Sequence, residues 1–360
     1  MAKKLAPGKK IKSKDSRARL YGLYFDESAR PLPNTDRSQY VFTAALLNQN
    51  QKLIIEERYL SLRQEMTESC LSLAPHLSEH RSIRGGLLEI HAVDMYQSKG
   101  IYREINKISP GFWRQQHEWI DRALKYAFES NVMYFAYPAD TESYVSATEE
   151  MIQFLISDTS LIKHESVREK IRLLASNPYF ICLSLVLSQV DNYLSRSGSK
   201  SDVYCHTNEE TSGFSSVKSF EILQQRKHLT SLRQPVFRTC SEEQAIQAAD
   251  VAGYILLQVS YSQKFGTPLK PEFLLWFRKY VAPKLKLDEH SMSHEHTRLL
   301  GALVFETILV SARGPEDFRQ SVDMMLPLAI NYMLNGGKLN TSALLAAMNK
   351  PPSEDGDLYG

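Results

Sequence analysis

The chain has 360 residues, of which 43% are hydrophobic and 23% are charged, as in an ordinary globular protein. This length allows one large domain with an appendage, or two domains. The cysteines are widely spaced, which excludes a disulfide framework and the usual cysteine-held zinc motifs, and they lie at Cys70, Cys182, Cys205 and Cys240.

Membrane attachment is not expected from the sequence. The most apolar helical stretch, residues 299–312, contains Glu306 and is too short to span a bilayer. The N-terminus is basic, but no apolar region of a secretory signal follows it. Together with the cysteine pattern, these features predict a cytoplasmic protein.

The net charge of +2 is distributed unevenly along the chain. The first 20 residues carry eight Lys or Arg and one acid, a local charge of +7, so the remainder carries −5. We therefore predict a basic arm over residues 1–19 that contacts nucleic acid or an acidic partner, with Lys9, Lys10 and Lys12 as candidate contacts. A solvated leader is the alternative reading.

Strands and helices alternate through the first 260 residues. The expected strands are residues 20–25 (LYGLYF), 39–47 (QYVFTAALL), 87–91 after Gly85-Gly86, 132–137 (VMYFAY), 203–206 and 235–238. The expected helices are 51–66, one that begins at Ser109-Pro110, 141–197 with a break at Asn177-Pro178, 216–231, and one that follows a capping box at residues 241–244. This order predicts an α/β fold, with a mixed sheet flanked by helices.

The pattern beyond residue 262 is helical throughout. Helices are expected at about 271–281, 293–312, 315–334 and 340–348. We therefore predict a core domain over 20–262, an all-helical C-terminal extension over 263–350 and an acidic tail over 351–360. The extension is a candidate surface for a protein partner or for homo-oligomerisation.

Acidic and imidazole side chains occur at four places where a metal site could form. Asp26-Glu27 follows the first strand, although a polar turn explains it equally well. Glu89 and His91 would share one face of a strand, which also suits a solvated edge. The third place is one face of a helix, which carries Glu243, Gln247, Asp250 and Tyr254 among alanines and Gly253. The fourth is the polar exit of the strand at 203–206, with His206, Asn208 and Glu209.

The fragments YFDES (24–28), LEIHAVD (88–94) and AIQAADVAGYIL (245–256) resemble, in this order, the domain-of-unknown-function family 3800, which is predicted to be ribonuclease-H-like. The resemblance covers about residues 20–260. It implies that Asp26, Glu89 and Asp250 form one acidic site, with Glu27, His91 and Gln247 nearby. The family usually has an Asp-Glu pair after the strand at 203–206, whereas this chain has His206 and Glu209.

These features favour a metal-dependent nuclease, and the resemblance implies a role in antiviral defence or mobile-element biology. Mg²⁺ or Mn²⁺ would be held by Asp26, Glu89 and Asp250, with His206 or Glu209 completing the set and His91 or Glu27 assisting proton transfer. A histidine ligand would shift the preference from Mg²⁺ toward Mn²⁺. The alternative is a catalytically degenerate subunit that binds nucleic acid or a protein partner.

Two further clusters carry less weight. Residues 288–296 are rich in histidine and acid, but they lack a zinc-binding spacing and favour a polar helix start. Arg226, Lys227 and Arg233 could contact phosphates, although a solvated helix face is the more ordinary interpretation.

Overall fold

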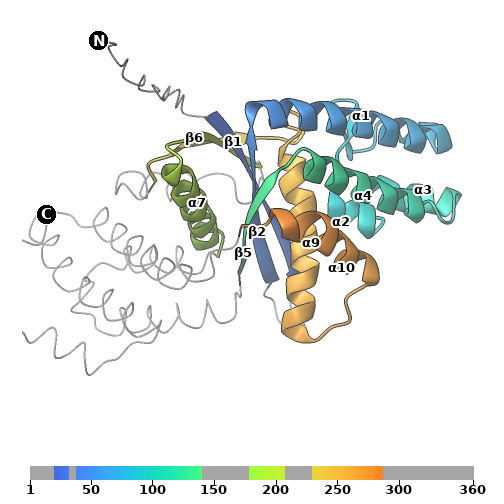
Figure 1. Cartoon of the computed structure of the whole chain (residues 1–360). Helices are drawn as coiled ribbons and strands as arrows, with labels where there is room; N and C mark the ends of the chain where they lie inside the picture. The colour runs from blue at the N-terminus through green and yellow to red at the C-terminus, as the bar shows by residue number, and fades with distance from the viewer. Residues whose placement is uncertain (1–19, 32–37, 140–177, 207–228, 287–360) are drawn as a thin grey trace, which may run out of the picture.

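The computed structural model describes residues 20–31, 38–139, 178–206 and 229–286 (Figure 1). Its centre is a five-stranded sheet in the order β5-β2-β1-β6-β7. The strands are β1 (Leu20–Pro31), β2 (Ser38–Asn48), β5 (Met133–Ala139), β6 (Lys200–His206) and β7 (Leu232–Arg238). Only β2 runs antiparallel to the other four, because β1 pairs antiparallel with β2 and parallel with β6. The predicted mixed α/β sheet is therefore confirmed.

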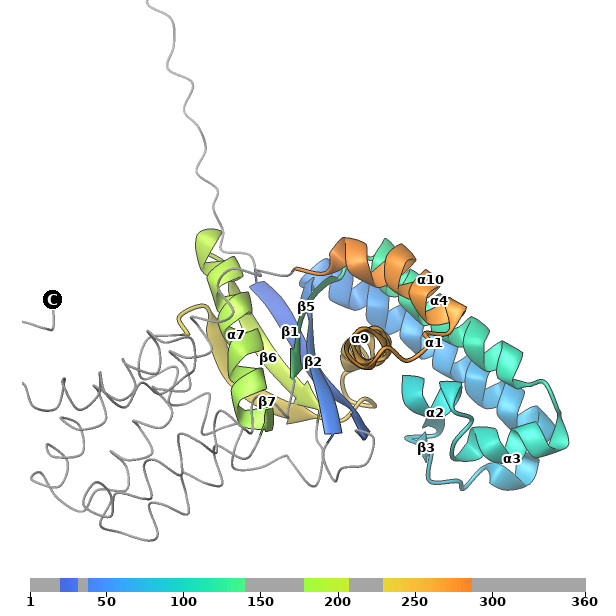
Figure 2. The same cartoon turned by 90° about the horizontal axis from the view of Figure 1, so that it is seen from below.

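Helices cover both faces of this sheet (Figure 2). Helix α7 (Pro178–Arg196) lies on one face, and α9 (Ile246–Phe265) lies on the other. Beyond α9 lie α1 (Gln49–Leu73), α2 (Ala92–Tyr96), α3 (Ile101–Ile108), α4 (Trp113–Glu129) and α10 (Pro271–Trp276), with the short helices η1 (Pro75–Leu77), η2 (Phe277–Val281) and η3 (Ala282–Lys284). No helix in these described segments is long and apolar enough to cross a membrane.

Strand β1 is longer than its sequence pattern predicts. It pairs with β2 as far as Pro31, whereas its pairing with β6 stops at Phe25. Asp26 and Glu27 therefore lie within β1 and not after it, which corrects the sequence prediction. Asp26 is placed where β6 ends, next to His206.

The predicted strand at 87–91 is also corrected. Only Leu87–Leu88 (β4) forms a strand, and it pairs with β3 (Ile83–Arg84) in a separate hairpin. Gly85 and Gly86 both have positive φ, as a two-residue hairpin turn requires. Residues 89–91 leave this ladder, because side chains of α9 take the backbone N–H groups of Ile90 and Ala92.

Helix starts were the least predictable boundaries. Asn48 forms a capping box with Gln51 at the start of α1. Ser109 does not cap α4, which begins at Trp113 without a side-chain cap. The capping box predicted at residues 241–244 is absent as well, because α9 starts at Ile246 and the Gln244 side chain instead accepts a hydrogen bond from Arg63.

The chain after residue 262 continues the same core over its described part. Helix α9 runs through the predicted boundary to Phe265. Phe273 and Trp276 of α10 are buried in the hydrophobic core shared with α9 and α4, and the Trp276 indole donates to Asp121. The predicted helices at 141–177 and 293–348, the tail and most of the 216–231 helix lie outside the described residues.

Close contact between α9 and the sheet depends on Gly253. A Cβ atom at this position would lie 3.0 Å from both Ser28 Oγ of β1 and Thr43 Oγ1 of β2. The predicted role of the small residues on this helix is thereby confirmed at Gly253. A methyl group at this position would require the two hydroxyl groups to shift by a few tenths of an ångström, and a larger side chain would press on both strands.

We expect Gly253→Val to lower the free energy of unfolding by about 1–3 kcal/mol, because overpacking forces the helix and sheet apart. Gln263→Val, at an exposed position of the same helix, is the control and should cost less than about 1 kcal/mol. Urea unfolding followed by circular dichroism measures both variants. Equal losses of unfolding free energy in the two variants would show that the close contact at Gly253 does not determine stability.

Candidate functional site

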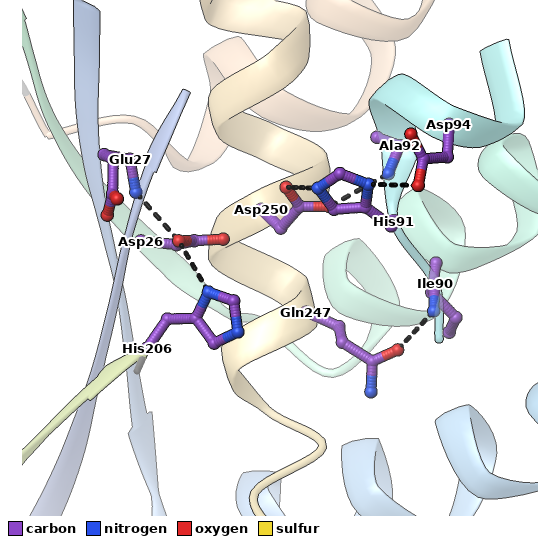
Figure 3. Close-up of polar contacts among 9 residues, drawn as sticks. All are labelled: Asp26, Glu27, Ile90, His91, Ala92, Asp94, His206, Gln247 and Asp250. Carbon is purple, nitrogen blue, oxygen red and sulfur yellow. Dashed lines mark hydrogen bonds and ion pairs between the residues drawn. The ribbon is translucent and has the colours of Figure 1, made fainter. Parts of the chain in front are cut away.

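Two buried carboxylates meet between the sheet and α9. Asp26 of β1 is 5% exposed and Asp250 of α9 is 6% exposed. Figure 3 shows them side by side, with His206 next to Asp26 and His91 next to Asp250. Their proximity is also electrostatic, because the charge of Asp26 contributes to the raised pKa of Asp250. The sequence prediction that these two residues share a site is consistent with this arrangement.

Each aspartate is paired with a histidine and a backbone N–H group. Asp26 Oδ1 accepts from the Glu27 N–H at 2.9 Å and lies 3.5 Å from His206 Nδ1. Asp250 Oδ2 accepts from the Ala92 N–H at 2.9 Å, and its Oδ1 lies 3.9 Å from His91 Nε2. Among the described residues, no lysine or arginine pairs with either carboxylate.

His91 lies between two acids. Its Nδ1 is 3.1 Å from Asp94 Oδ2, and its Nε2 faces Asp250. The three-residue spacing of His91 and Asp94 is visible in the sequence, but the role of Asp94 was not predicted. Asp94 holds the imidazole ring in one orientation, because it pairs with Nδ1 while Nε2 faces Asp250.

The segment that carries Glu89 and His91 is held by helices on either side. Gln247 Oε1 of α9 accepts from the Ile90 N–H at 2.6 Å. From α1, the buried Arg63 donates through Nε to the Leu88 carbonyl at 2.6 Å, and Thr67 Oγ1 accepts from the Leu88 N–H. Arg63 was not predicted as part of this region, because nothing in the sequence around it indicates a buried arginine.

The predicted polar face of α9 is largely confirmed. Gln247 and Asp250 contact the backbone at 90–92, and the Tyr254 hydroxyl accepts from Gln97 at 3.4 Å. Glu243 does not belong to this face, because it precedes the helix and pairs with Lys52 at 2.9 Å. The face therefore docks the 90–97 segment against the sheet layer.

Glu89 lies near the two aspartates but makes no contact with them. The buried thiol of Cys240 lies close enough to all three acids to be affected by their charges. Burial raises the pKa of Cys240 well above 9, and the charges of Asp26, Glu89 and Asp250 each raise it further. Glu89 Oε1 is buried without a hydrogen-bond partner, as is Nε2 of His206. The resemblance implied that Glu89 belongs to the site, and the structure brings it into the same neighbourhood.

Glu27 does not join the cluster. Successive side chains of a strand point to opposite faces, so Glu27 lies on the face of β1 opposite to Asp26. Figure 3 shows its carboxylate directed away from Asp26. The pKa of Cys205, which is also on that opposite face, is raised first by burial and then by Glu27. The charge of Glu27 nevertheless adds to the raised pKa of His206, and its role in proton transfer stays a prediction.

Several predicted contacts lie outside the described residues, namely Glu209, Arg226, Lys227, Lys9, Lys10 and Lys12. Arg233 is described, and it pairs with Asp202 at 2.9 Å at the far end of β6 from His206. The histidine-rich stretch at 288–296 is also outside this part of the chain.

Three groups of the site, Asp250, His91 and His206, have pKa values raised above those of free side chains. Burial raises the pKa of Asp250 from 3.8 to about 6, and Asp26 adds to the rise against the opposing effects of His91, the Ala92 N–H and His206. Burial lowers the pKa of His91, but the charges of Asp250 and Asp94 outweigh this effect and raise it from 6.5 to about 9. For His206, burial is likewise outweighed by Asp26, and the pKa rises.

Comparison with protein-family models, with curated proteins and with solved structures finds no match to this chain. The class of protein shown is thus a mixed α/β fold with a buried carboxylate–histidine cluster between its sheet and α9.

The site makes stability depend on pH in a defined direction. Because the folded pKa of His91 exceeds 6.5, its contribution to stability is complete below pH 6.5 and is lost as the pH rises toward 9. Asp250 gives the same sign between about pH 4 and 6. We expect the free energy of unfolding in EDTA to fall between pH 6.5 and 9, and to fall less steeply in His91→Gln.

Urea unfolding at a series of pH values measures this dependence. One full proton corresponds to about 1.4 kcal/mol per pH unit, and the slope should be well below this limit because the His91 side chain is 45% exposed. His76→Gln, at an exposed histidine in η1, is the control. A slope that His91→Gln leaves unchanged would contradict the assignment.

Proposed function

We propose that this protein is a metal-dependent nuclease with a ribonuclease-H-like core, which hydrolyses phosphodiester bonds at the Asp26–Asp250 cluster. The observation that carries the proposal is the burial of these two carboxylates side by side. Burying two like charges together costs stability, and the described residues offset that cost through two histidines and backbone N–H groups, with no arginine or lysine. A catalytic or binding function explains this loss of stability better than a structural role does.

The fold supports the proposal. A five-stranded sheet in the order β5-β2-β1-β6-β7, with β2 alone antiparallel, suits a ribonuclease-H-like core. The three fragments that resemble family 3800 come together in space and supply Asp26, His91 and Asp250. Fragments that are far apart in the sequence therefore contribute to one cluster.

The types of donor present suit a divalent cation, but the described side chains, in their present positions, do not form a metal shell. Within the described segments, no three His, Cys, Asp or Glu side chains lie close enough to hold a metal ion as they stand. Glu89 Oε1 and His206 Nε2 are nevertheless buried polar atoms without a hydrogen-bond partner. Carboxylate oxygens and an imidazole nitrogen suit Mn²⁺, and oxygen ligands alone suit Mg²⁺.

In this proposal, Asp26, Glu89, Asp250 and His206 would hold the metal. A divalent ion bound there would supply an activated water and neutralise charge on the leaving oxygen. The charges of Asp250 and Asp94 raise the pKa of His91 and favour its protonated form, so in this proposal it would donate a proton to the leaving oxygen. Asp94 keeps the ring oriented for that transfer.

We expect Asp26→Asn and Asp250→Asn each to reduce Mn²⁺-dependent cleavage of labelled single-stranded, duplex and hybrid substrates by on the order of 100-fold or more. The loss of residues that only support metal ligands already costs roughly 10- to 100-fold, so the loss of a ligand should cost at least this much. Asp202→Asn is the control, because Asp202 pairs with Arg233 away from the cluster.

Calorimetric titration with Mn²⁺ accompanies the cleavage assay, and matched melting curves exclude unfolding of the variants. Cleavage that both site variants retain would contradict the proposal, as would metal binding that neither variant weakens.

A catalytically degenerate binding subunit is the second candidate. One observation favours it: each aspartate is already paired with a histidine, and the described side chains form no metal shell. This second function would be supported if the native protein bound nucleic acid but neither bound Mn²⁺ nor cleaved any of the substrates.

A further inference from the structure

A pocket of about 350 Å³ opens beside the cluster. Arg81, Ser82 and Arg84 of the β3–β4 hairpin region line one part of it, and Glu89, His91 and His206 line another. The pocket thus combines two guanidinium groups with the acids and imidazoles of the candidate site. The two arginines give one side of the pocket a positive charge, which suits an anionic ligand.

The hairpin that carries the arginines is fixed in place. Arg63 and Thr67 of α1 hold Leu88 at its end. At the other end, the side chain of Ser82 lies against Gly100, where a Cβ atom would lie only 2.8 Å from Ser82 Oγ. Because both ends are anchored, the arginines are held against the pocket and not on a freely moving loop.

Two observations indicate that this pocket binds a ligand. Glu89 and His206 each line it, and each carries a buried side-chain atom without a hydrogen-bond partner. Arg81 and Arg84 are exposed. The charge of Arg81 helps to lower the pKa of Asp94, which also lines the pocket, but no described carboxylate forms a salt bridge with either arginine. Guanidinium groups bind phosphate oxygens in bidentate geometry, so a phosphate would satisfy both arginines.

We propose that this pocket holds one nucleotide unit of a single-stranded nucleic acid, with Arg81 and Arg84 binding its phosphate groups. A volume of about 350 Å³ is at the small end of ligand pockets and suits one unstacked nucleotide. Bases of a single strand can leave the stack and enter such a pocket, whereas those of a duplex are paired. This inference rests on the proposed function, since it names the substrate of the same site.

The test measures binding of short fluorescent oligonucleotides by anisotropy, in EDTA, with the full-length chain. The double variant Arg81→Gln/Arg84→Gln should bind single-stranded DNA or RNA about tenfold more weakly at low salt, because exposed ion pairs contribute modestly. The slope of log K against log salt should become shallower by about 1.4, for two lost phosphate contacts on a single strand. Arg278→Gln, at an exposed arginine of η2, is the control and should match the native chain.

Separate measurements with single-stranded RNA and single-stranded DNA show whether the pocket prefers ribose or deoxyribose. A measurement with a duplex shows whether binding requires a single strand. The inference would be overturned if the double variant kept the affinity and the salt slope of the native chain. It would also be overturned if the native chain bound a duplex as tightly as a single strand, and if the double variant lost as much affinity for the duplex. Absence of oligonucleotide binding by the native chain would overturn it as well.

Parallel cleavage assays with Mn²⁺ separate this inference from the proposed nuclease. Weakened binding in the double variant, together with no cleavage by the native protein, would support the pocket and overturn the nuclease. Cleavage with an unchanged KM in the double variant would support the nuclease and overturn the pocket.

Discussion

The close approach of α9 to the central sheet is the constraint on which the rest of the structure depends. Gly253 lets the helix lie against Ser28 of β1 and Thr43 of β2. One turn before Gly253, at Asp250, the same helix brings a carboxylate to the sheet beside Asp26. A helix farther from the sheet would place Asp250 in a separate layer, and the cluster of acids and histidines would not form.

The same helix also positions the third contributor to the site. The side chains of Gln247 and Asp250 accept the N–H groups of Ile90 and Ala92, which no neighbouring strand satisfies. Buried N–H groups need partners, so these bonds determine where the 89–92 segment lies. Asp250 thus has two roles, because one oxygen anchors the backbone while the other faces His91. Its position is therefore defined both by the fold and by the site.

How much of this could be predicted from the sequence differs between elements. The main strands and the long helices follow from apolar periodicity, and Asp250 stands out as an acid among alanines and glycine. The path of residues 89–91 could not be predicted, because its hydrogen bonds go to side chains of a helix that is distant in the sequence. Glu27 was misplaced for a related reason, since the strand continues past Asp26 and alternation then points Glu27 to the other face.

His206 replaces the acid that the resemblance leads one to expect at the exit of β6. Its Nδ1 faces Asp26, and its Nε2 is buried without a partner. Histidines that bind metals usually donate their other ring N–H to a carboxylate, which fixes the ring and raises its basicity. The Asp26–His206 pair has this form. In the proposed site, an imidazole nitrogen of His206 would stand where the resemblance leads one to expect a carboxylate oxygen, and Asp26 would both bind the metal and orient this ring. Such a site would favour Mn²⁺ over Mg²⁺, because imidazole suits transition metals.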